Sequence, residues 1–451
     1  MKKNKNITKI LAAALLAVLI AFSSGCSKQR DYGENFNLET DCQHSYYCGV
    51  SFWKRTQSDG AGQYILKDDY IYYYNTEKKT MAPLCNKANC LHDMETNENR
   101  LNDCNAYAPT LGALEFIQYY DGYIYYVNED WEECSLYRVK KDGSKKDKIF
   151  TTNKETSIIN WLIHRGQLYY ATLSYYYGED KTNQVYNKCI LNSLELSSNM
   201  NEKDAKVIFE SDEKHSVIGL DNLKAYKNYI CYNVTANTND VEWTTTDSWF
   251  EQLYEPTYIY NIETGENREI PVPEGYSEAT SAGEVVFLED KMLFKVGDGT
   301  QDGEYKFPVY SMNYDLTDQK IWLDGVEQFK QVQTYDDYVI ISDAKLHYEE
   351  TLDDDGALQF VLKDDKPCTN VEIYSSDAKR ISYFVYPMNR WGNGNFNGFG
   401  PDGVNVEFDE DDNSWYVYEL NFKDVLNCHG ETVKLDLVNT RSFGALNKQE
   451  G

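Results

Sequence analysis

Three cysteines and one histidine lie close together in the chain with the spacing of metal ligands. Cys85, Cys90, His92 and Cys104 form the pattern C-x4-C-x-H-x11-C. Three thiolates and one imidazole match the tetrahedral ligand set of a structural zinc site. Four protein ligands leave no open position for water or substrate, so the pattern predicts a structural metal rather than a catalytic one.

Disulfides are the alternative for the same residues if the chain is exported to an oxidising compartment. Cys85, Cys90 and Cys104, together with Cys42 or Cys48, could make two bridges. The sequence does not report the redox state of the habitat, so zinc and disulfides both stay open.

A second set of residues could bind a ligand by ring stacking. Flat apolar rings interspersed with acceptors such as Asp240, Glu242 and Asp247 suit a sugar or a peptide. The nominated ligand-binding residues are Tyr175, Tyr176, Tyr177, Trp243, Trp249, Tyr254, Arg390 and Trp391. Packing of these rings against the body of the protein is the alternative.

The sequence nominates no catalytic residue. Asp and Glu number 73, so no carboxylate pair stands out. The sialidase box Ser-x-Asp-x-Gly-x-x-Trp, the Gly-x-Ser-x-Gly elbow and the His-Glu-x-x-His helix are all missing. This favours a noncatalytic protein, with a polysaccharide-acting hydrolase or lyase as the alternative.

The elements that must position these residues recur as short bursts of aliphatic residues and Tyr, each preceded by an Asp, Gly or Asn turn. The excess of Tyr, 39 residues against 9 Pro, favours sheet over helix. Successive bursts start 44 to 62 residues apart, and each is followed by a loop and another short strand. The six clear bursts are residues 69–73, 122–126, 166–170, 228–232, 290–294 and 337–341.

Units of this length cannot bury both faces of a small sheet alone, and radial stacking of such sheets gives a β-propeller. We therefore expect an all-β propeller of four-stranded antiparallel blades over residues 46–440, followed by a C-terminal tail, 441–451. A further unit between Val404 and Tyr418 suggests seven blades, with six and eight open. Two β-sandwich domains are the alternative fold.

If each burst is the second strand of its blade, four long connections follow a second strand: residues 174–186, 235–255, 297–307 and 343–367. The same connection opens on the same face in every blade, so these insertions should gather on one rim. Loops carried by a rigid scaffold commonly bind ligands, and this rim is the predicted binding surface.

The chain resembles bacterial surface lipoproteins of unknown function whose β-propeller domain is similar to that of low-density-lipoprotein-receptor-related proteins. The resemblance rests on the GYIYY repeat at 122–126, the LYRVKKDG repeat at 136–143 and the stretch Leu84–His92, and it covers most of residues 45–440. The receptor signature Tyr-Trp-Thr-Asp is absent, so the receptors' ligand-binding properties do not carry over.

The N-terminus has the three parts of a secretory signal. Lys2, Lys3, Lys5 and Lys9 precede the apolar run Ile10–Phe22, and Ser23-Ser24-Gly25-Cys26 follows. The run is shorter than the roughly 20 residues that a membrane span needs. We expect a lipoprotein signal peptide, 1–25, a lipid on Cys26, a tether, 26–45, and a location on the extracytoplasmic face of the cell membrane. Ser23 stands where lipoproteins usually have Leu, so ordinary signal cleavage is the alternative.

The formal net charge is -29 at pH 7. Such a field repels polyanions, so nucleic acid is excluded as a partner. The expected partners are the membrane, through the lipid, and a glycan, peptide or surface protein. The expected function is a membrane-anchored binding module, and a structural envelope or sensor scaffold is a further alternative.

Overall fold

The structure is a computed structural model that describes residues 32–43, 56–90, 103–110, 116–129, 133–152, 156–177, 184–211, 215–238, 253–276, 282–296, 306–327, 331–345, 348–352, 358–362, 368–387, 396, 398–411 and 414–442. The chain divides into two compact units, Met1–Asn35 and Phe36–Gly451. Of the first unit only residues 32–35 are described, and all the sheets belong to the second.

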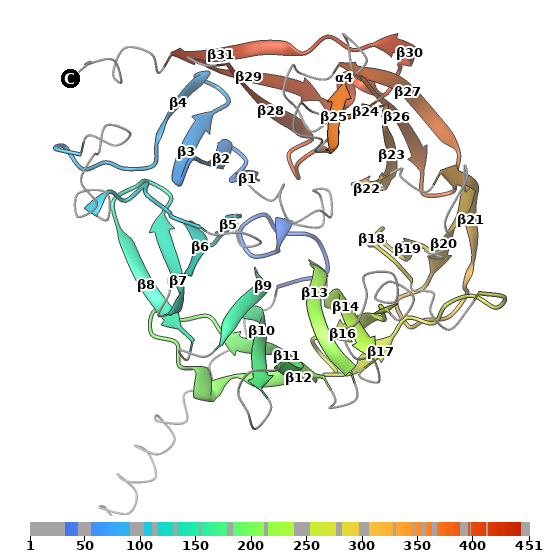
Figure 1. The fold of residues 1–451 in the computed structure, drawn as a ribbon. Coiled ribbons are helices and arrows are strands. Elements are labelled where there is room, and N and C mark those ends of the chain that lie inside the picture. Colours follow the sequence, from blue (N-terminus) through green and yellow to red (C-terminus); the bar gives the residue numbers. More distant parts are fainter. Residues whose placement is uncertain are drawn as a thin grey trace, which may run out of the picture. The chain divides into compact units, whose positions relative to one another are not determined.

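Six sheets of the second unit each contain four strands in antiparallel order and lie radially as the blades of a propeller (Figure 1). Blade 1 contains β1 (Thr56–Ser58), β2 (Gly62–Lys67), β3 (Tyr70–Asn75) and β4 (Thr80–Pro83). Blade 2 contains β5 (Gln118–Tyr120), β6 (Tyr123–Glu129), β7 (Cys134–Lys140) and β8 (Lys146–Thr151). Blade 3 contains β9 (Ser157–His164), β10 (Gln167–Tyr177), β11 (Gln184–Glu195) and β12 (Lys206–Glu210), with the 3-10 helix η5 (Glu202–Asp204) before β12.

Two of the next three blades, blades 4 and 6, carry an additional short strand. Blade 4 contains β13 (His215–Tyr226), β14 (Tyr229–Thr238), β16 (Thr257–Asn261) and β17 (Asn267–Glu269), and β15 (Leu253–Tyr254) pairs with β14. Blade 5 contains β18 (Val285–Phe287), β19 (Met292–Lys295), β20 (Lys306–Met312) and β21 (Lys320–Glu327). Blade 6 contains β22 (Gln331–Tyr335), β23 (Tyr338–Lys345), β26 (Cys368–Ser375) and β27 (Arg380–Pro387), and β30 (His429–Thr432) pairs with β27 in parallel.

Two smaller sheets complete the described part of the chain. A hairpin of β24 (Tyr348–Leu352) and β25 (Leu358–Leu362) stands within the connection from β23 to β26. A three-stranded sheet contains β28 (Val404–Asp411), β29 (Ser414–Asn421) and β31 (Asp436–Ser442), and the short helix α4 (Phe422–Val425) follows β29. The predicted all-β propeller of four-stranded antiparallel blades is thus confirmed, with six such blades.

Tyrosine forms much of the core. The largest fully buried side chains are Trp161, Tyr64, Tyr72, Tyr74, Tyr119, Tyr125, Tyr126, Tyr169, Tyr170, Tyr232 and Tyr386. Apolar clusters link neighbouring blades: Ile71 of β3 and Ile124 of β6 lie in one cluster, and Cys231 of β14 and Phe294 of β19 lie in another. Each blade therefore buries its faces against its neighbours, which a single small sheet could not do alone.

Tight turns join the first and second strands. In blades 2 and 3 these turns are Asp121-Gly122 and Arg165-Gly166, and all four residues have positive φ. Two consecutive left-handed residues match the twist of antiparallel strands, which is why Gly recurs at the second position. We call this connection the first turn of a blade.

The predicted bursts are second strands in five blades. Those starting at 122, 166, 228, 290 and 337 correspond to β6, β10, β14, β19 and β23. In blade 1 the burst at 69–73 is instead the third strand, β3, because the preceding residues of β2 already form the second. Its second and third strands are joined by Asp68 and Asp69, not by the loop after Asn75.

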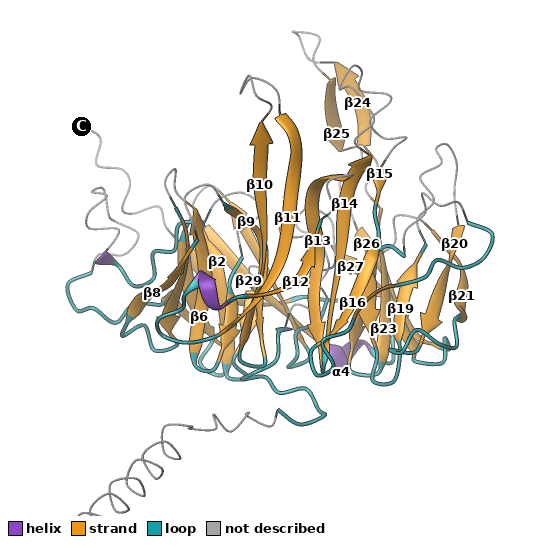
Figure 2. Ribbon diagram, turned by 90° about the horizontal axis from the view of Figure 1, so that it is seen from below, coloured by secondary structure: helices purple, strands orange, loops and turns teal. Residues whose placement is uncertain are grey.

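Second strands end, and third strands begin, on the face opposite the first turns, because consecutive strands of a blade are antiparallel. We call this the hairpin face. The long hairpin of β10 and β11, the start of β13, the end of β14, and the hairpin of β24 and β25 all project on this side of the second unit (Figure 2).

The start of the second unit differs from the predicted domain boundary. The unit begins at Phe36 rather than 46, and Thr40, Asp41, Cys42 and Gln43 are only 0–2% exposed. The polarity of residues 36–43 and their lack of a hydrophobic pattern predict a tether. Hydrogen bonds to the blades hold these residues in place, so this part of the predicted tether belongs to the propeller unit.

The described residues contain no helix that is long and apolar enough to cross a membrane. The predicted signal peptide and Cys26 lie outside the described residues.

Candidate metal centre and ligand-binding face

Three of the four predicted metal ligands converge. Cys85, Cys90 and Cys104 place their Sγ atoms within 4.8 Å of one another. Zinc–thiolate bonds of about 2.3 Å put tetrahedral sulfur atoms about 3.8 Å apart, so small inward movements would complete three corners of a zinc site. A three-cysteine cluster that could hold a metal such as zinc is therefore present, and the donor set fits the ion.

The start of β3 holds both arms of this cluster, which we call the cysteine knuckle (residues 84–90 and 103–108). Leu84 N donates to Ile71 O over 2.8 Å, which extends the pairing of β4. Ile71 N donates to Ala106 O over 2.8 Å, and Ala108 N donates to Asp69 O over 2.7 Å. Two stretches distant in sequence thus share one strand, and this brings Cys85 and Cys104 together.

The knuckle also forms hydrogen bonds with the neighbouring blade 2. Gly143, in the turn from β7 to β8, accepts hydrogen bonds from Asn86 N at 3.2 Å and from Asn105 Nδ2 at 2.8 Å. Lys146 of β8 donates its Nζ to Cys104 O at 2.7 Å and to Tyr107 O at 3.1 Å. The knuckle therefore fastens blade 1 to blade 2, which agrees with a structural role.

Sequence reasoning missed these supporting residues. The Asp142-Gly143 pair is recognisable as a turn, but nothing in its sequence says that it lies against the cysteines. Glycine is required at position 143 because there is no room for a side chain: a Cβ there would lie 2.8 Å from Cys85 N and Leu84 C.

The thiols differ in acidity. Burial opposes ionisation of Cys85, but hydrogen bonds from the backbone N–H groups of Lys87 and Asn105 and from the Cys90 and Cys104 thiols outweigh it, so the pKa of Cys85 lies below its ordinary value. Burial, followed by the interactions with Cys90 and Cys85, raises the pKa of Cys104 to about 12. Burial also lowers the pKa of Lys146 to about 8. A divalent cation would relieve the repulsion between the thiolates, because it stabilises all three at once.

The remaining members of the predicted cluster are not brought together with these three. His92 lies outside the described residues. Cys42 is 1% exposed and packs in a different apolar cluster, with Leu162 and Leu220, so the structure does not bring it to the knuckle. None of Cys85, Cys90 and Cys104 forms a disulfide in the structure. Cys48 lies outside the described residues.

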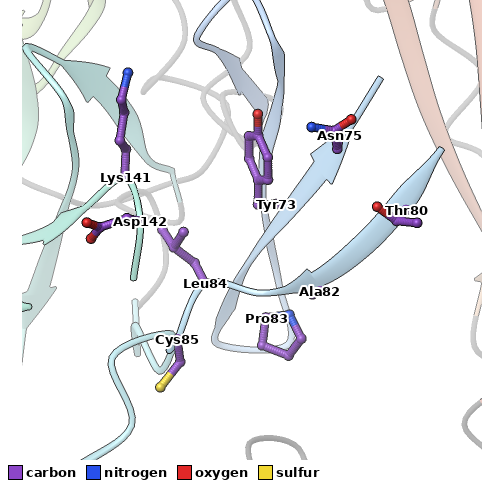
Figure 3. Close-up of a pocket in the computed structure, with 9 residues that line it drawn as sticks. All are labelled: Tyr73, Asn75, Thr80, Ala82, Pro83, Leu84, Cys85, Lys141 and Asp142. Atoms are coloured by element: carbon purple, nitrogen blue, oxygen red, sulfur yellow. The ribbon is translucent and has the colours of Figure 1, made fainter. Parts of the chain in front are cut away.

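A pocket of about 330 Å³ lies beside the knuckle (Figure 3). The Cys85 sulfur points away from Tyr73 and Lys141, which line the same pocket (Figure 3). The lining residues of the pocket are Tyr73, Asn75, Thr80, Ala82, Pro83, Leu84, Cys85, Lys141 and Asp142.

The predicted ligand-binding residues are placed only in part. Tyr175, Tyr176 and Tyr177 belong to β10 rather than to a loop, because β10 and β11 continue pairing as far as Tyr177 and Gln184. Tyr254 belongs to β15, next to the end of β14. The side chains of these four tyrosines lie outside what the structure describes, and so do Trp243, Trp249, Arg390 and Trp391.

No family model and no curated protein matches the chain. Among solved structures, oligogalacturonate lyase from Vibrio parahaemolyticus is 10% identical with a TM-score of 0.47, over 86% of this chain and 92% of that one. Tricorn protease is 10% identical with a TM-score of 0.43, over 86% of this chain and 35% of that one. TolB from Acinetobacter baumannii is 12% identical with a TM-score of 0.33, over 80% of this chain and 76% of that one. The likeness is one of fold, and no activity or partner is carried over.

Proposed function

We propose that this protein is a noncatalytic binding module, held by a lipid on Cys26 at the extracytoplasmic face of the membrane, whose hairpin face takes a glycan, peptide or protein ligand. One observation carries the proposal. The strands that lead into the long connections of blades 3, 4 and 6 all project on the hairpin face (Figure 2). Insertions that gather on one face of a rigid ring build a composite surface without disturbing the core.

Paired variants test the binding part. Trp243→Ala and Trp249→Ala remove rings from the connection between β14 and β16, and Tyr383→Ala removes a 38% exposed ring from the outer part of blade 6. On glycan and peptide arrays, wild type and Tyr383→Ala should bind the same ligands, and the two Trp variants should bind them at least tenfold more weakly. Equal binding by all four proteins would remove the connection from the binding surface.

Lipidation has its own test. Cells that express the full-length chain are grown with radiolabelled palmitate, alongside cells that express Cys26→Ser. The wild type should incorporate label and sediment with membranes, and the variant should do neither. Label in both proteins, or in neither, would refute the anchor at Cys26.

We further propose that the three-stranded sheet of β28, β29 and β31 belongs to a seventh blade. Gln118 and Lys224 each lie three residues before a first turn, and each donates to the first strand of the next blade, at Ile163 O and Val285 O. Gln333 has the same position in blade 6 and donates its Nε2 to Phe396 O over 3.1 Å. By this rule Phe396 occupies the place of a first strand, eight residues before the start of β28 at Val404.

Contacts on the other side of this sheet support the same view. Asp402, just before β28, accepts hydrogen bonds from Ser58 Oγ and Gln63 Nε2 of blade 1, both at 2.8 Å. Val406 and Val417 share an apolar cluster with Ile71 of blade 1. An experimental structure in which residues 396–442 pack outside the ring would refute the seventh blade.

For the knuckle we propose a structural zinc ion held by Cys85, Cys90 and Cys104, with His92 as the fourth ligand. Protein purified without chelator should contain one zinc per chain. Denaturation in the presence of a chelator should expose three more reactive thiols than denaturation without one. Absence of zinc together with a loss of two thiols would establish a disulfide instead.

A further inference from the structure

Residues 36–43, which we call the N-terminal segment, enter the ring from a defined side. Exposure falls along the segment, from the exposed Asn37 to Gln43, which is 0% exposed. The chain therefore passes from solvent at Asn37 into the protein at Gln43.

The segment contacts three blades at their first turns. Asp121 N donates to Glu39 O at 2.7 Å, and Tyr119 Oη donates to Glu39 Oε2 at 2.6 Å, in blade 2. Arg165 N donates to Thr40 O at 2.8 Å in blade 3. In blade 1, Ser58 N donates to Gln43 Oε1 at 2.8 Å and Gln43 Nε2 donates to Ser58 O at 2.6 Å.

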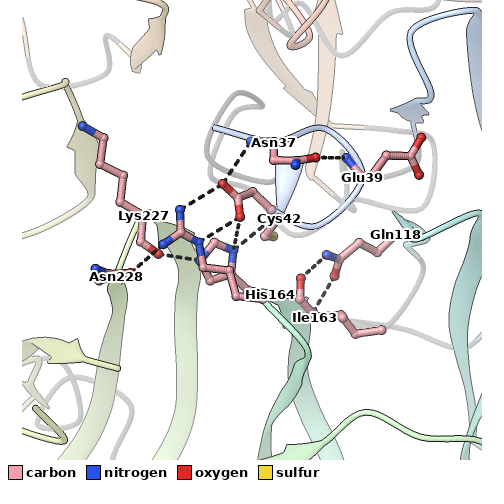
Figure 4. A network of polar contacts seen from close by, with 10 residues as sticks. Asn37, Glu39, Cys42, Gln118, Ile163, His164, Lys227 and Asn228 are labelled. Carbon is pink, nitrogen blue, oxygen red and sulfur yellow. Dashed lines mark hydrogen bonds and ion pairs between the residues drawn. The ribbon is translucent and has the colours of Figure 1, made fainter. Parts of the chain in front are cut away.

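A buried ion pair fixes the middle of the segment (Figure 4). Arg165 Nε donates to Asp41 Oδ1 at 3.0 Å, and the two side chains are 3% and 2% exposed. Arg165 Nη1 also donates to Asn228 Oδ1 at 2.5 Å, which ties in the first turn of blade 4. Cys42 N donates to His164 Nδ1 at 3.1 Å. A buried ion pair with its remaining donors satisfied resists separation, because either partner alone would be an uncompensated buried charge.

All these partners lie at or next to first turns, so the chain leaves the ring on the first-turn face, opposite the hairpin face. Nine residues, 27–35, separate Cys26 from Phe36. Ten steps along an extended chain span at most about 35 Å. To reach the hairpin face, the tether would have to cross the four strands of a blade, spaced about 4.8 Å apart, and then run along the length of a strand such as the eight-residue β9. That path needs about 40 Å.

We propose that the N-terminal segment orients the propeller, with the first-turn face toward the membrane and the hairpin face toward macromolecules of the surrounding medium. This rests on the proposed lipid at Cys26. The short tether cannot reach round the blades, so the hairpin face is withheld from the lipids of the anchoring membrane and left free for the ligand.

Fluorescence quenching on liposomes measures the orientation. Asp290, exposed in the first turn of blade 5, and Glu129, at the hairpin-face end of β6, are each replaced with a fluorescent amino acid by amber suppression in the full-length lipidated protein. Phospholipids that carry a nitroxide on the headgroup act as quencher. Quenching should be several-fold stronger at 290 than at 129. Equal quenching, or stronger quenching at 129, would overturn the proposal.

A longer tether provides the matched control. Thirty Gly/Ser residues inserted after Arg30 raise the maximal extended reach of the tether to about 140 Å, well beyond the route round the blades, so the difference between the two probes should disappear. A difference that persists would show that something other than the tether sets the orientation. Failure of the anchor is distinguishable, because the protein would then not float with the liposomes at all.

Discussion

Replacement of Gly143 by Ala should detach the cysteine knuckle from blade 2. Gly143 has φ +70, and a Cβ there would lie 2.8 Å from Cys85 N and Leu84 C and 2.9 Å from Cys85 Cα. All three are backbone atoms, so no side-chain rotation relieves the collision. The knuckle must move, and the hydrogen bonds from Asn86 N and Asn105 Nδ2 to Gly143 O should lengthen or break.

The expected cost has two parts. A non-glycine residue in the left-handed region costs about 1 to 2 kcal/mol. Loss of the two hydrogen bonds adds about 1 kcal/mol each. Gly122→Ala is the matched control, because Gly122 has φ +77 and nothing lies within 4 Å of its added Cβ. It should cost the conformational part alone, so the two variants should differ by about 2 kcal/mol.

Urea unfolding measures the difference in stability, and hydrogen exchange of peptides covering residues 84–90 reports the knuckle directly. Gly143→Ala should accelerate exchange there and speed the transfer of zinc to a competing chelator, whereas Gly122→Ala should change neither. If the two variants lose equal stability and exchange equally, then the contact between Gly143 and Cys85 does not hold the knuckle, and the reasoning fails.

Three further outcomes are expected. Burial, partly offset by Asp41 at 3.9 Å and reinforced by Arg165, lowers the pKa of His164 to about 4. The unfolded chain takes up a proton on this residue near pH 6.5 and the folded chain only near pH 4. The free energy of unfolding should therefore fall by about 3 kcal/mol as the pH is lowered from about 6.5 to about 4, and the fall should be smaller in His164→Gln. Asp402→Ala should cost about 3 kcal/mol in urea unfolding by removing the acceptor of Ser58 and Gln63, whereas Asp424→Ala, at an exposed position of α4, should cost under about 0.5. Treatment with a strong zinc chelator should lower the melting temperature of the wild type but not of Cys104→Ser, and zinc rather than magnesium should restore it.

The sequence predicts the blades well because their signals are local. Two-residue turns such as Asp121-Gly122 and the alternating bursts that follow them depend on neighbours in the chain. Proximity in the sequence likewise nominates Cys85, Cys90 and Cys104. The burst in blade 1 misleads, because β2 and β3 are both apolar and rich in aromatic residues, and only pairing decides which of them is the second strand.

Contacts between blades are poorly predicted for the opposite reason. Gly143 faces Cys85 across 58 residues of chain, and Asp402 meets Ser58 across 344. Neither contact follows a hydrophobic period, so no local pattern records it. The sequence also does not predict that β10 and β11 continue into the expected loop, because the polar residues of that stretch suit a loop as well as a hairpin.

The N-terminal segment shows why polarity alone is a poor guide to a tether. Asn37 to Gln43 would be assigned to solvent on any hydropathy scale, yet Asp41 is 2% exposed. Its burial is tolerated because Arg165 neutralises the carboxylate, and because the backbone groups of Glu39, Thr40 and Cys42 find partners on blades 2 and 3. The first turns of blades 2 and 3 contact this segment directly, and the first turn of blade 4 contacts Arg165. The same contacts that bury a polar stretch therefore also fix the side from which the chain enters. The proposed orientation of the ring therefore depends on the pairing of Asp41 with Arg165, because this buried ion pair holds the middle of the segment in place.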